Sequence, residues 1–593
     1  MKKLILLLTV MLATPMGLLA QYSWQDATLV NSSPGTQYFS LLENHWYKII
    51  VPEEGQVDIL VLAEGPWTMQ NCVFYRYSEN LNTVIQRGTF GCAANVASFS
   101  SDDLGPGVYY FYLEGRYPQD TPMNYTLDIT YTFTPCALAA DPEPNDDYEH
   151  SSLIESGNTV EGRLGYVSTE GVTDTDDWYR IDVPEEGQIE FIATATGTMK
   201  FYPYYSTVNG YKNNGIYSRG SFTGNTNSAS QTDTMTFKAT DVGAGTYYIK
   251  IHQYPGTGSG GYRLYYKFTP CPQAADPEPN NDYEHSSLLE SGKTVEGRLG
   301  YRTSDDVTDT DDWYRIVVPE EGQIELIATA TGTVRFYPYY STVNGYRDNG
   351  IYSRGTFTGN TSSASQTDTM TFKATDVGPG TYYIKIHQFP GTGAGGYKLY
   401  YKFTPCVYGA DPEPNDDYQH ASRLMNGVTT EGRLGYRVSD GTTDTEDWYR
   451  ITVPKVGHVE FDINGFDDLK LRDCAIYTLN GTTFTKVSNF SGNNTNKVTF
   501  EADDFAKNTY YIKVGRYLGL GGYSIRYDGP ISDILGDVDG DGNVSIGDVS
   551  DLIDFLLKGD ALSTLANADV DGDGHVTIGD VSDLIDMLLR GIH

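Results

Sequence analysis

The chain is poor in basic residues, and it has no long apolar run after its first twenty residues. Lys and Arg together number 41 against 78 Asp and Glu, which gives a formal net charge of −37. This acidic excess argues against a nucleic-acid partner, because phosphate backbones are bound by clustered Lys and Arg. No later apolar run reaches the roughly 20 residues that span a bilayer. The sequence therefore predicts no transmembrane segment.

Cysteine is also scarce, with six in the chain and no regular CxxC spacing, which argues against a zinc site. In an oxidising compartment cysteines can pair. Cys72 and Cys92 lie in one segment of the chain, and we predict that they join neighbouring strands. Cys136, Cys271 and Cys406 each follow a Phe-Thr-Pro sequence, and their pairing is left open.

Signatures of catalysis are missing as well. The chain has no Gly-x-Ser-x-Gly elbow and no His-Glu-x-x-His motif. Ser259 is replaced by Ala394 in a later repeat, while His252 and His387 are matched by Gly515 in another. Paired carboxylates can serve a glycosidase, but here they belong to a signature present in three copies. The sequence favours a non-catalytic protein, with a polysaccharide- or peptide-hydrolysing enzyme as the alternative.

The first residues have the pattern of a secretory signal. Met1-Lys2-Lys3 precedes an apolar run from Leu4 to Ala13, and cleavage is predicted after Ala20. We therefore expect a secreted, extracellular protein that reaches a cell surface only through a partner.

The remaining composition is typical of β structure. The chain has 48 Tyr and an aromatic content of 13%, and short runs of alternating polarity are separated by turn sequences such as Glu-Glu-Gly and Asn-Gly. In the run from Trp178 to Val183, alternation places Tyr179, Ile181 and Val183 on one face. The predicted fold class is mainly β, with tandem antiparallel β-sandwiches of a jelly-roll-like kind followed by a small helical segment.

An acidic signature in two parts repeats at an interval of 135 residues. Its first part begins at Asp141, Asp276 and Asp411, and its second part at Asp174, Asp309 and Asp444. The first copy is degenerate, because it contains the run His45 to Gly55 but neither acidic part. We expect it to keep the fold without the ion site. The predicted divisions are 1–20 signal peptide, 21–136 (first module), 137–271 (second), 272–406 (third), 407–529 (fourth) and 530–593, a C-terminal pair of loop–helix units.

This signature predicts a cation site in each full copy. The prolines in Asp141-Pro-Glu143-Pro-Asn145 hold the chain extended, so that these three polar side chains share one side. Asp174 and Asp177 lie at the start of a strand, and together the five would offer oxygens to a hard cation. Like-charged neighbours raise one another's pKa unless they are neutralised or solvated. A solvated acidic linker is the alternative.

The C-terminal segment contains two acidic loops, Asp537 to Asp548 and Asp569 to Asp580, each followed by an amphipathic helix. Oxygen ligands at loop positions 1, 3, 5 and 12, a carbonyl at 7 and Gly at 6 are the requirements of an EF-hand-like calcium loop. The predicted ligands are Asp537, Asp539, Asp541, Asn543, Ser545 and Asp548, then Asp569, Asp571, Asp573, His575, Thr577 and Asp580.

This duplicated loop–helix segment resembles a type I dockerin. The resemblance implies calcium as the cofactor and a cohesin-like module as the protein partner, commonly within extracellular polysaccharide-degrading machinery. Partner choice in that family is commonly set near loop positions 10 and 11, which here are Ile546-Gly547 and Ile578-Gly579 instead of the usual Ser/Thr pair. The identity of the cohesin is therefore open.

The repeated modules resemble the bacterial pre-peptidase C-terminal domain and the collagen-binding domain of clostridial collagenases. The shared motifs are the Glu-Pro-Asn-Asp opening, the Asp-x-Asp-Trp-Tyr strand and the Gly-Thr-Tyr-Tyr-Ile-Lys-Ile strand. The resemblance implies a β-sandwich whose N-terminal linker is ordered by calcium. It implies as ligands Asp141, Glu143, Asn145, Asp146, Asp174 and Asp177; Asp276, Glu278, Asn280, Asn281, Asp309 and Asp312, with Asn281 weakening its site; and Asp411, Glu413, Asn415, Asp416, Asp444 and Asp447.

Outward aromatic residues suggest a ligand-binding face. If the strands from Tyr247 and from Tyr262 are neighbours, alternation gives an aromatic and basic strip that suits a polysaccharide or a collagen-like peptide. Its aromatic members would be Tyr248, Tyr254 and Tyr265, with Tyr383, Phe389 and Tyr400 in the next copy. The alternative is that these tyrosines merely cover a sheet.

Together these patterns predict a secreted, calcium-binding, non-catalytic modular protein that a dockerin attaches to a cohesin-type partner. Its expected role is binding or targeting in extracellular polysaccharide or protein degradation. The alternatives are an enzyme with an unrecognised site and a surface adhesin.

Overall fold

The structure is a computed structural model. It describes residues 23–31, 45–65, 68–116, 126–196, 201–207, 218–221, 223–224, 234–253, 257–304, 307–331, 336–342, 353–356, 369–388, 393–439, 441–490 and 495–591. The predicted signal segment lies outside the described residues. The chain divides into two compact units, one of Met1–Cys271 with Tyr301–Thr308 and the other of Pro272–Gly300 with Asp309–His593.

The first module folds as two sheets with the strand orders β1-β2-β8-β4-β5 and β6-β7-β3-β9. Its elements are η1 (Trp24–Asp26), β1 (Thr28–Leu29), β2 (His45–Val51), β3 (Gly55–Glu64), β4 (Thr68–Ser78), β5 (Thr83–Thr89), β6 (Gly91–Ala93), β7 (Val96–Leu104), β8 (Gly107–Arg116) and β9 (Thr126–Pro135). Side chains from both sheets form one buried core.

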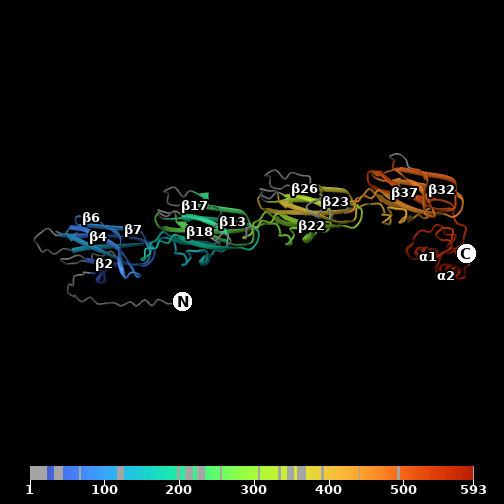
Figure 1. Ribbon diagram of the computed structural model, residues 1–593. Helices are drawn as coiled ribbons and strands as arrows, with labels where there is room; N and C mark the ends of the chain where they lie inside the picture. Colours follow the sequence, from blue (N-terminus) through green and yellow to red (C-terminus); the bar gives the residue numbers. More distant parts are fainter. Residues whose placement is uncertain are drawn as a thin grey trace. The chain divides into compact units, whose positions relative to one another are not determined.

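The second module repeats this arrangement, with the orders β10-β12-β18-β14-β15 and β11-β19-β13-β17-β16. Its elements are η2 (Tyr148–His150), β10 (Ser152–Leu153), β11 (Thr159–Leu164), β12 (Asp176–Val183), β13 (Gly187–Ala195), β14 (Phe201–Thr207), β15 (Ser218–Ser221), β16 (Thr223–Gly224), β17 (Thr234–Val242), β18 (Gly245–Gln253) and β19 (Gly260–Pro270). Figure 1 shows β13 and β17 in one layer and β18 in the other. The pairing of β2 with β8 in the first module matches that of β12 with β18 in the second.

The third module has the orders β20-β22-β27-β24-β25 and β21-β28-β23-β26. Its elements are η4 (Tyr283–His285), β20 (Ser287–Leu288), β21 (Lys293–Leu299), β22 (Asp311–Val318), β23 (Gly322–Ala330), β24 (Phe336–Thr342), β25 (Ser353–Thr356), β26 (Thr369–Val377), β27 (Gly380–Gln388) and β28 (Gly395–Pro405).

The fourth module has the orders β29-β31-β37-β34-β35, with β33 also on β37, and β30-β38-β32-β36. Its elements are β29 (Ser422–Arg423), β30 (Thr429–Leu434), β31 (Glu446–Val453), β32 (Gly457–Gly465), β33 (Lys470–Leu471), β34 (Ala475–Asn480), β35 (Thr483–Asn489), β36 (Lys497–Phe505), β37 (Asn508–Leu518) and β38 (Gly521–Asp528).

Alternation along the strands builds each core, as predicted. On β12, Tyr179, Ile181 and Val183 are buried between the sheets, while Arg180 and Asp182 are exposed. Such a pattern fits a strand whose successive side chains point to opposite faces. The sandwiches are not wholly antiparallel, because the two-residue strands β1, β10, β20 and β29 pair in parallel with β2, β12, β22 and β31.

The C-terminal segment contains the helices α1 (Ile546–Lys558) and α2 (Ile578–Arg590). Each begins with a capping box, Ser545 with Asp548 and Thr577 with Asp580, which satisfies orphan N–H groups of the first turn. α1 ends at Lys558 and is capped by Gly559, whose φ of 78° suits the left-handed cap. The apolar residues of these amphipathic helices are only partly buried. None of the described helices has the length and apolar character of a membrane span.

Candidate metal centres

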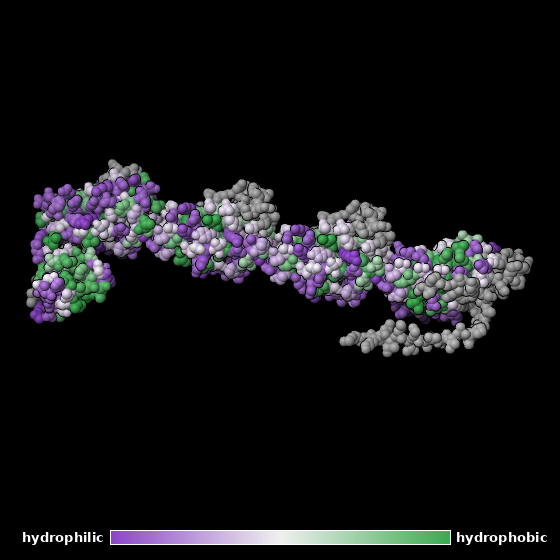
Figure 2. Space-filling view, turned by 180° about the vertical axis from the view of Figure 1, so that it is seen from behind, coloured by the Kyte–Doolittle hydropathy of each residue, from purple (hydrophilic) through white to green (hydrophobic). Residues whose placement is uncertain are grey.

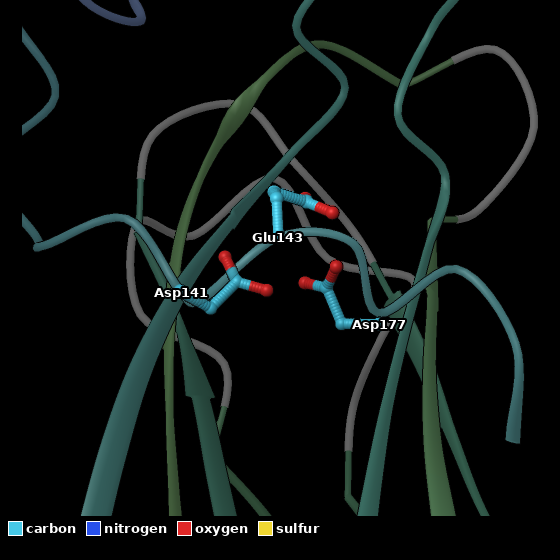
Figure 3. Close-up of side chains that lie close together, drawn as sticks. All are labelled: Asp141, Glu143 and Asp177. Atoms are coloured by element: carbon cyan, nitrogen blue, oxygen red, sulfur yellow. The ribbon is translucent and has the colours of Figure 1, made fainter. Parts of the chain in front are cut away.

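The two parts of the acidic signature are joined by a backbone hydrogen bond in the second module. The N–H of Trp178, on β12, donates to the carbonyl of Asn145 at 2.9 Å. This bond holds the extended segment with Asp141 and Glu143 against the strand that carries Asp177. Ligating oxygens of these three carboxylates lie within 4.8 Å of one another. Figure 3 shows Asp141 and Asp177 pointing toward each other, with Glu143 beside them.

Neighbouring donors fix the orientation of two of these carboxylates. Asp141 Oδ1 accepts from the backbone N–H of Arg163 at 3.1 Å, and its Oδ2 accepts from the amide nitrogen of Asn145. Asp177 Oδ2 accepts from the buried hydroxyl of Tyr262 at 2.6 Å. Each carboxylate still has acceptor capacity, because an ionised carboxylate has about four lone-pair sites.

Buried oxygens without donors show that the site suits a cation. Asn145 Oδ1, Asp174 Oδ1 and Asp177 Oδ1 are buried without a hydrogen-bond partner, although buried polar atoms are nearly always satisfied. Burial raises the pKa of Asp174 to about 8, and the charges of Glu143 and Asp141 add to this effect. Burial also raises the pKa of Asp177 well above its usual value. A hard divalent cation would satisfy these oxygens and favour their ionised forms.

The same positions come together in the later copies, namely Asp276, Glu278 and Asp312 in the third module and Asp411, Glu413 and Asp447 in the fourth. The N–H of Trp313 donates to Asn280 at 2.9 Å. In the fourth module, the N–H of Trp448 donates to Asn415 at 2.8 Å. Oxygens without partners recur as well, on Asn280, Asp312, Asn415, Asp444 and Asp447.

The pKa shifts recur with the geometry. Burial raises the pKa of Asp309 to about 8 and that of Asp444 to about 9, and neighbouring carboxylates add to both shifts. In the fourth module burial also raises the pKa of Glu413 to about 7. The same unfavourable charge arrangement therefore occurs in three modules, and a hard cation would neutralise it in each.

Asn281 distinguishes the third module. With its amide nitrogen turned toward Asp309, it donates to Asp309 Oδ1 and to the carbonyl of Asp311, each at 3.0 Å. The corresponding oxygens of Asp174 and Asp444 have no donor. The third module thus combines one negative charge fewer with an internal donor, which is a physical basis for the predicted weaker site.

Asp146 and Asp416 lie at the edge of their sites. Both side chains are exposed. Their charges nevertheless contribute to the raised pKa of Asp174 and of Asp444, respectively. They are close enough to act on an ion electrostatically, and their role as direct ligands stays a prediction.

Two residues that hold the second module's site were not found from the sequence. Tyr262 sits beneath Asp177, where its hydroxyl also bonds the hydroxyl of Tyr179 at 2.7 Å. Gly162 makes room for it, because a Cβ there would lie 2.3 Å from the Tyr262 hydroxyl. Arg163, whose N–H holds Asp141, is the other. The only sequence signal was the recurrence of Glu-Gly-Arg-Leu and Gly-Gly-Tyr in all three copies.

Arg163 also joins its site to the preceding module. Its Nε donates to the carbonyl of Leu138 at 2.6 Å, and its Nη1 pairs with Glu53 and Glu54 of the first module, each at 3.0 Å. The side chain is only 7% exposed, so the charge depends on these partners. Arg433 repeats the arrangement in the fourth module.

The C-terminal loops fold around their first and last acids. Asp537, fully buried, accepts from the N–H of Asp541 at 2.9 Å and of Gly542 at 2.8 Å. Asp548, at loop position 12, accepts from the N–H of Asp539 at 2.9 Å. Ligating oxygens of Asp537, Asp539 and Asp548 lie within 4.8 Å of one another. The second loop brings Asp569, Asp571 and Asp580 together in the same way.

The remaining predicted loop ligands have backbone partners. The hydroxyls of Ser545 and Thr577 accept from the N–H groups of Gly547 and Gly579, at 3.0 and 3.1 Å, as helix N-caps. The N–H groups of Asn543 and His575 donate to Asp541 and Asp573, each at 2.8 Å. These bonds give the tight turns that a calcium loop needs.

Comparison with known families identifies this segment. Residues 535–589 match the family described as the dockerin type I domain. These residues are a dockerin. The dockerin implies a cohesin partner, dockerins generally bind calcium, and proteins that carry them are typically extracellular.

Solved structures similar to the chain include three that have low sequence identity to it. The pre-peptidase C-terminal domain of a collagenase from Bacillus anthracis is 18% identical, covers 21% of this chain and 100% of its own, and has a TM-score of 0.16. A putative secreted protein from Eubacterium rectale is 12% identical, with coverage of 42% and 74% and a TM-score of 0.13. An archaeal virus protein with a triple jelly roll is 11% identical, with coverage of 63% and 90% and a TM-score of 0.12. No curated protein matches the chain.

The predicted ligand strip does not form, because its strands lie on different sheets. Tyr248 is on β18 and Tyr265 is on β19, and β18 pairs with β12 and β14 whereas β19 pairs with β11 and β13. Tyr383 on β27 and Tyr400 on β28 are separated in the same way. The other two predicted members, Tyr254 and Phe389, lie outside the described residues.

The predicted Cys72–Cys92 disulfide is absent from the structure, in which both residues are thiols. Cys72 is on β4 and Cys92 on β6, which belong to different sheets of the first module, so the two cysteines do not lie on neighbouring strands of one sheet. Their side chains nevertheless meet, and Cys92 adds to the raised pKa of the Cys72 thiol. Burial raises the pKa of the Cys72 thiol to about 12, so the reactive thiolate is scarce at neutral pH.

Proposed function

We propose that the chain is a secreted, calcium-binding, non-catalytic component of extracellular polysaccharide or protein degradation, which its dockerin attaches to a cohesin. The observation that supports this proposal most strongly is the dockerin itself, because dockerins act by binding a protein partner. The β-sandwich modules then act as the binding or targeting part.

Exposed apolar side chains on the dockerin provide the partner surface. Ile546 and Ile578, at the helix starts, are 75% and 72% exposed, and Leu557 and Leu589, at the ends, are 78% and 80% exposed. Leu557 and Leu589 do not belong to the small buried core of this segment. Figure 2 shows apolar surface on this segment. Exposed apolar clusters of this kind mark protein interaction sites.

For the sandwich modules, we propose that ligand binding falls on the sheet that contains β12 and β18. Tyr248 meets Tyr148 edge to face with ring centroids 5.8 Å apart. Tyr383 meets Tyr283 in the same geometry, also at 5.8 Å. Aromatic rings that are half-buried on a sheet can stack on a sugar ring or on the ring of a proline-rich peptide. The proposed ligand is a polysaccharide or a collagen-like peptide.

Capture on immobilised cohesins tests the attachment. The mature chain should bind at least one cohesin of a varied panel in calcium and should be released by a chelator. The double variant Ile578→Asp with Leu589→Asp should lose this binding, because it places charges in the apolar contact. Val487→Asp, at a 45% exposed position in the fourth module, is the control. Failure of the mature chain on every cohesin would contradict the proposal.

Glycan and collagen arrays test the sandwich modules. Tyr248→Ala should weaken retention on the ligand that the mature chain selects, whereas Tyr265→Ala, on the opposite sheet, should not. Release of soluble sugars or peptides from the same substrates by the purified chain would favour the enzymatic alternative over the binding role.

A further inference from the structure

The fourth module differs from the earlier ones at one exposed edge position. A two-residue strand at the edge of one sheet pairs in parallel with its neighbour in the second and third modules. The second residue of this strand is Leu153 in the second module and Leu288 in the third, and these side chains are 45% and 49% exposed. In the fourth module the same position is Arg423 on β29. The fourth module is also the one that the dockerin follows in the chain. The fourth module therefore has a guanidinium group at a position where the other described copies have an alkyl group.

Arg423 contacts the first calcium loop of the dockerin and its helix. Nη1 lies 3.0 Å from Asp539 Oδ2 and 2.8 Å from Asp551 Oδ2, and Nη2 donates to the Asp539 carbonyl. Asp539 is at loop position 3, and Asp551 is on α1. The side chain of Asp539 is only 9% exposed and that of Arg423 28%. Charge-assisted bonds from one guanidinium to a carboxylate and a carbonyl fix the orientation of that residue.

Further contacts between the fourth module and the segment that leads into the dockerin support the same arrangement. Asn426 accepts from the N–H of Gly529 at 2.8 Å and donates to its carbonyl at 3.1 Å. Lys455 pairs with Asp533 at 2.5 Å, at a position where the second module has Glu185. A small cavity of about 20 Å³ lies between the two parts and is lined by Arg423, Asn426 and Asp539 among others.

The two calcium loops have nearly the same sequence but different surroundings. A Cβ added at Gly542 in the first loop would lie 3.3 Å from Pro454 of the fourth module, whereas one at Gly574 in the second loop would meet nothing within 4 Å. The side chain of Asp539 is nearly covered, while its counterpart Asp571 is exposed. The nearly identical loop sequences do not explain this difference in exposure, so the difference arises from the neighbouring fourth module.

We propose that Arg423 is a positioning residue that clamps the first calcium loop onto the fourth module, so that the two loops are not equivalent. The clamp orients Asp539 from outside the ion site, and a group bonded to a metal ligand typically affects metal affinity by 10–100-fold. When the first loop binds an ion, the clamp would hold Asp539 in place as a ligand, whereas the second loop has no such support and is open to solvent. This inference rests on the dockerin loops binding calcium, and not on the identity of any cohesin.

Hydrogen–deuterium exchange of the mature chain in saturating calcium tests the clamp. Exchange of the backbone amides of 537–548 should be slower than that of 569–580, even though the loops are alike in sequence. Arg423→Leu, which introduces the residue of the earlier copies, should raise first-loop exchange roughly tenfold, toward the second-loop rate. Asp551→Asn should have a smaller effect in the same direction, because it weakens one contact outside the loop.

Arg526→Leu is the matched control. It removes the same charge from the same module, and its partner Asp528 lies on the same strand. It should change exchange in neither loop. Protection of the α1 amides checks that Arg423→Leu leaves the dockerin folded.

Equal exchange of the two loops in the unmodified chain, or a first loop unaffected by Arg423→Leu, would overturn the clamp. Both loops remaining unprotected at any calcium concentration would overturn it too, together with calcium binding. Cohesin capture by Arg423→Leu separates this result from the proposed function, because attachment should survive loss of the clamp.

Discussion

The hydroxyl of Tyr262 donates to Asp177 Oδ2 at 2.6 Å in the interior of the second module. Tyr262 lies on β19 and Asp177 on β12, so the bond crosses from one sheet of the sandwich to the other. The acidic cluster is therefore anchored to the core of the sandwich through Asp177. The same bond joins Tyr397 to Asp312 at 2.6 Å and Tyr523 to Asp447 at 2.5 Å.

Tyr262→Phe should lower calcium affinity of the second module roughly tenfold, because the donor that orients a metal ligand is lost. Calorimetry on residues 21–271, which retain Glu53 and Glu54 beside Arg163, measures this. Tyr266→Phe is the control, since the Tyr266 hydroxyl on the same strand is buried without a partner. Equal affinities for both variants would contradict a supporting role for Tyr262.

Asp174→Asn combined with Asp177→Asn should abolish calcium binding by the second module, because the two buried carboxylates lose their charge. Asp176→Asn tests the specificity of this effect. Asp176 lies between them in the sequence but pairs with Lys250 at 2.8 Å and with His252. Its replacement should leave the stoichiometry measured by calorimetry unchanged. Binding that persists in the double variant would restore the solvated-linker interpretation.

Asn281→Asp should strengthen the third module's site by roughly tenfold, since ligand charge count tunes calcium affinity. The change adds a carboxylate and removes the amide that donates to Asp309. The reverse change in the second module, Asp146→Asn, should weaken that site to a similar degree. Calorimetry of the two isolated modules measures both changes. Weaker binding by Asn281→Asp, or tighter binding by Asp146→Asn, would show that the amide assists the ion.

Calcium removal should unfold the dockerin. Its buried core has seven residues, and small cores of this kind depend on a metal for stability. A chelator should remove the helical part of the circular dichroism spectrum of the mature chain while the strand signal remains. Asp537→Asn with Asp569→Asn should show the chelated spectrum even in calcium. A helical signal that does not change when calcium is removed would count against the assignment of the two loops as calcium sites.

The sequence predicted the carboxylate clusters because their ligands recur at fixed spacing, and spacing is visible in one dimension. Asp141, Glu143 and Asp177 were found in this way, as were the dockerin loops. Tyr262 and Arg163 were not, because a residue that orients a ligand need only be near it in space. Alternation on β18 and β19 correctly gave the inward and outward faces.

Alternation does not reveal which sheet a strand joins, and this is why Tyr248 and Tyr265 were wrongly placed side by side. Nor does it reveal which loop a neighbouring module will cover. The dockerin loops are nearly identical in sequence, and only their three-dimensional surroundings, which include Arg423 beside the first loop, distinguish them.

Anomalous diffraction from crystals of the mature chain grown in calcium tests the central claim most directly. The account predicts an anomalous peak between Asp141, Glu143 and Asp177, one at the corresponding position in the third and fourth modules, and one in each dockerin loop. Carboxylates turned into solvent, with no peak at any of these centres, would contradict it.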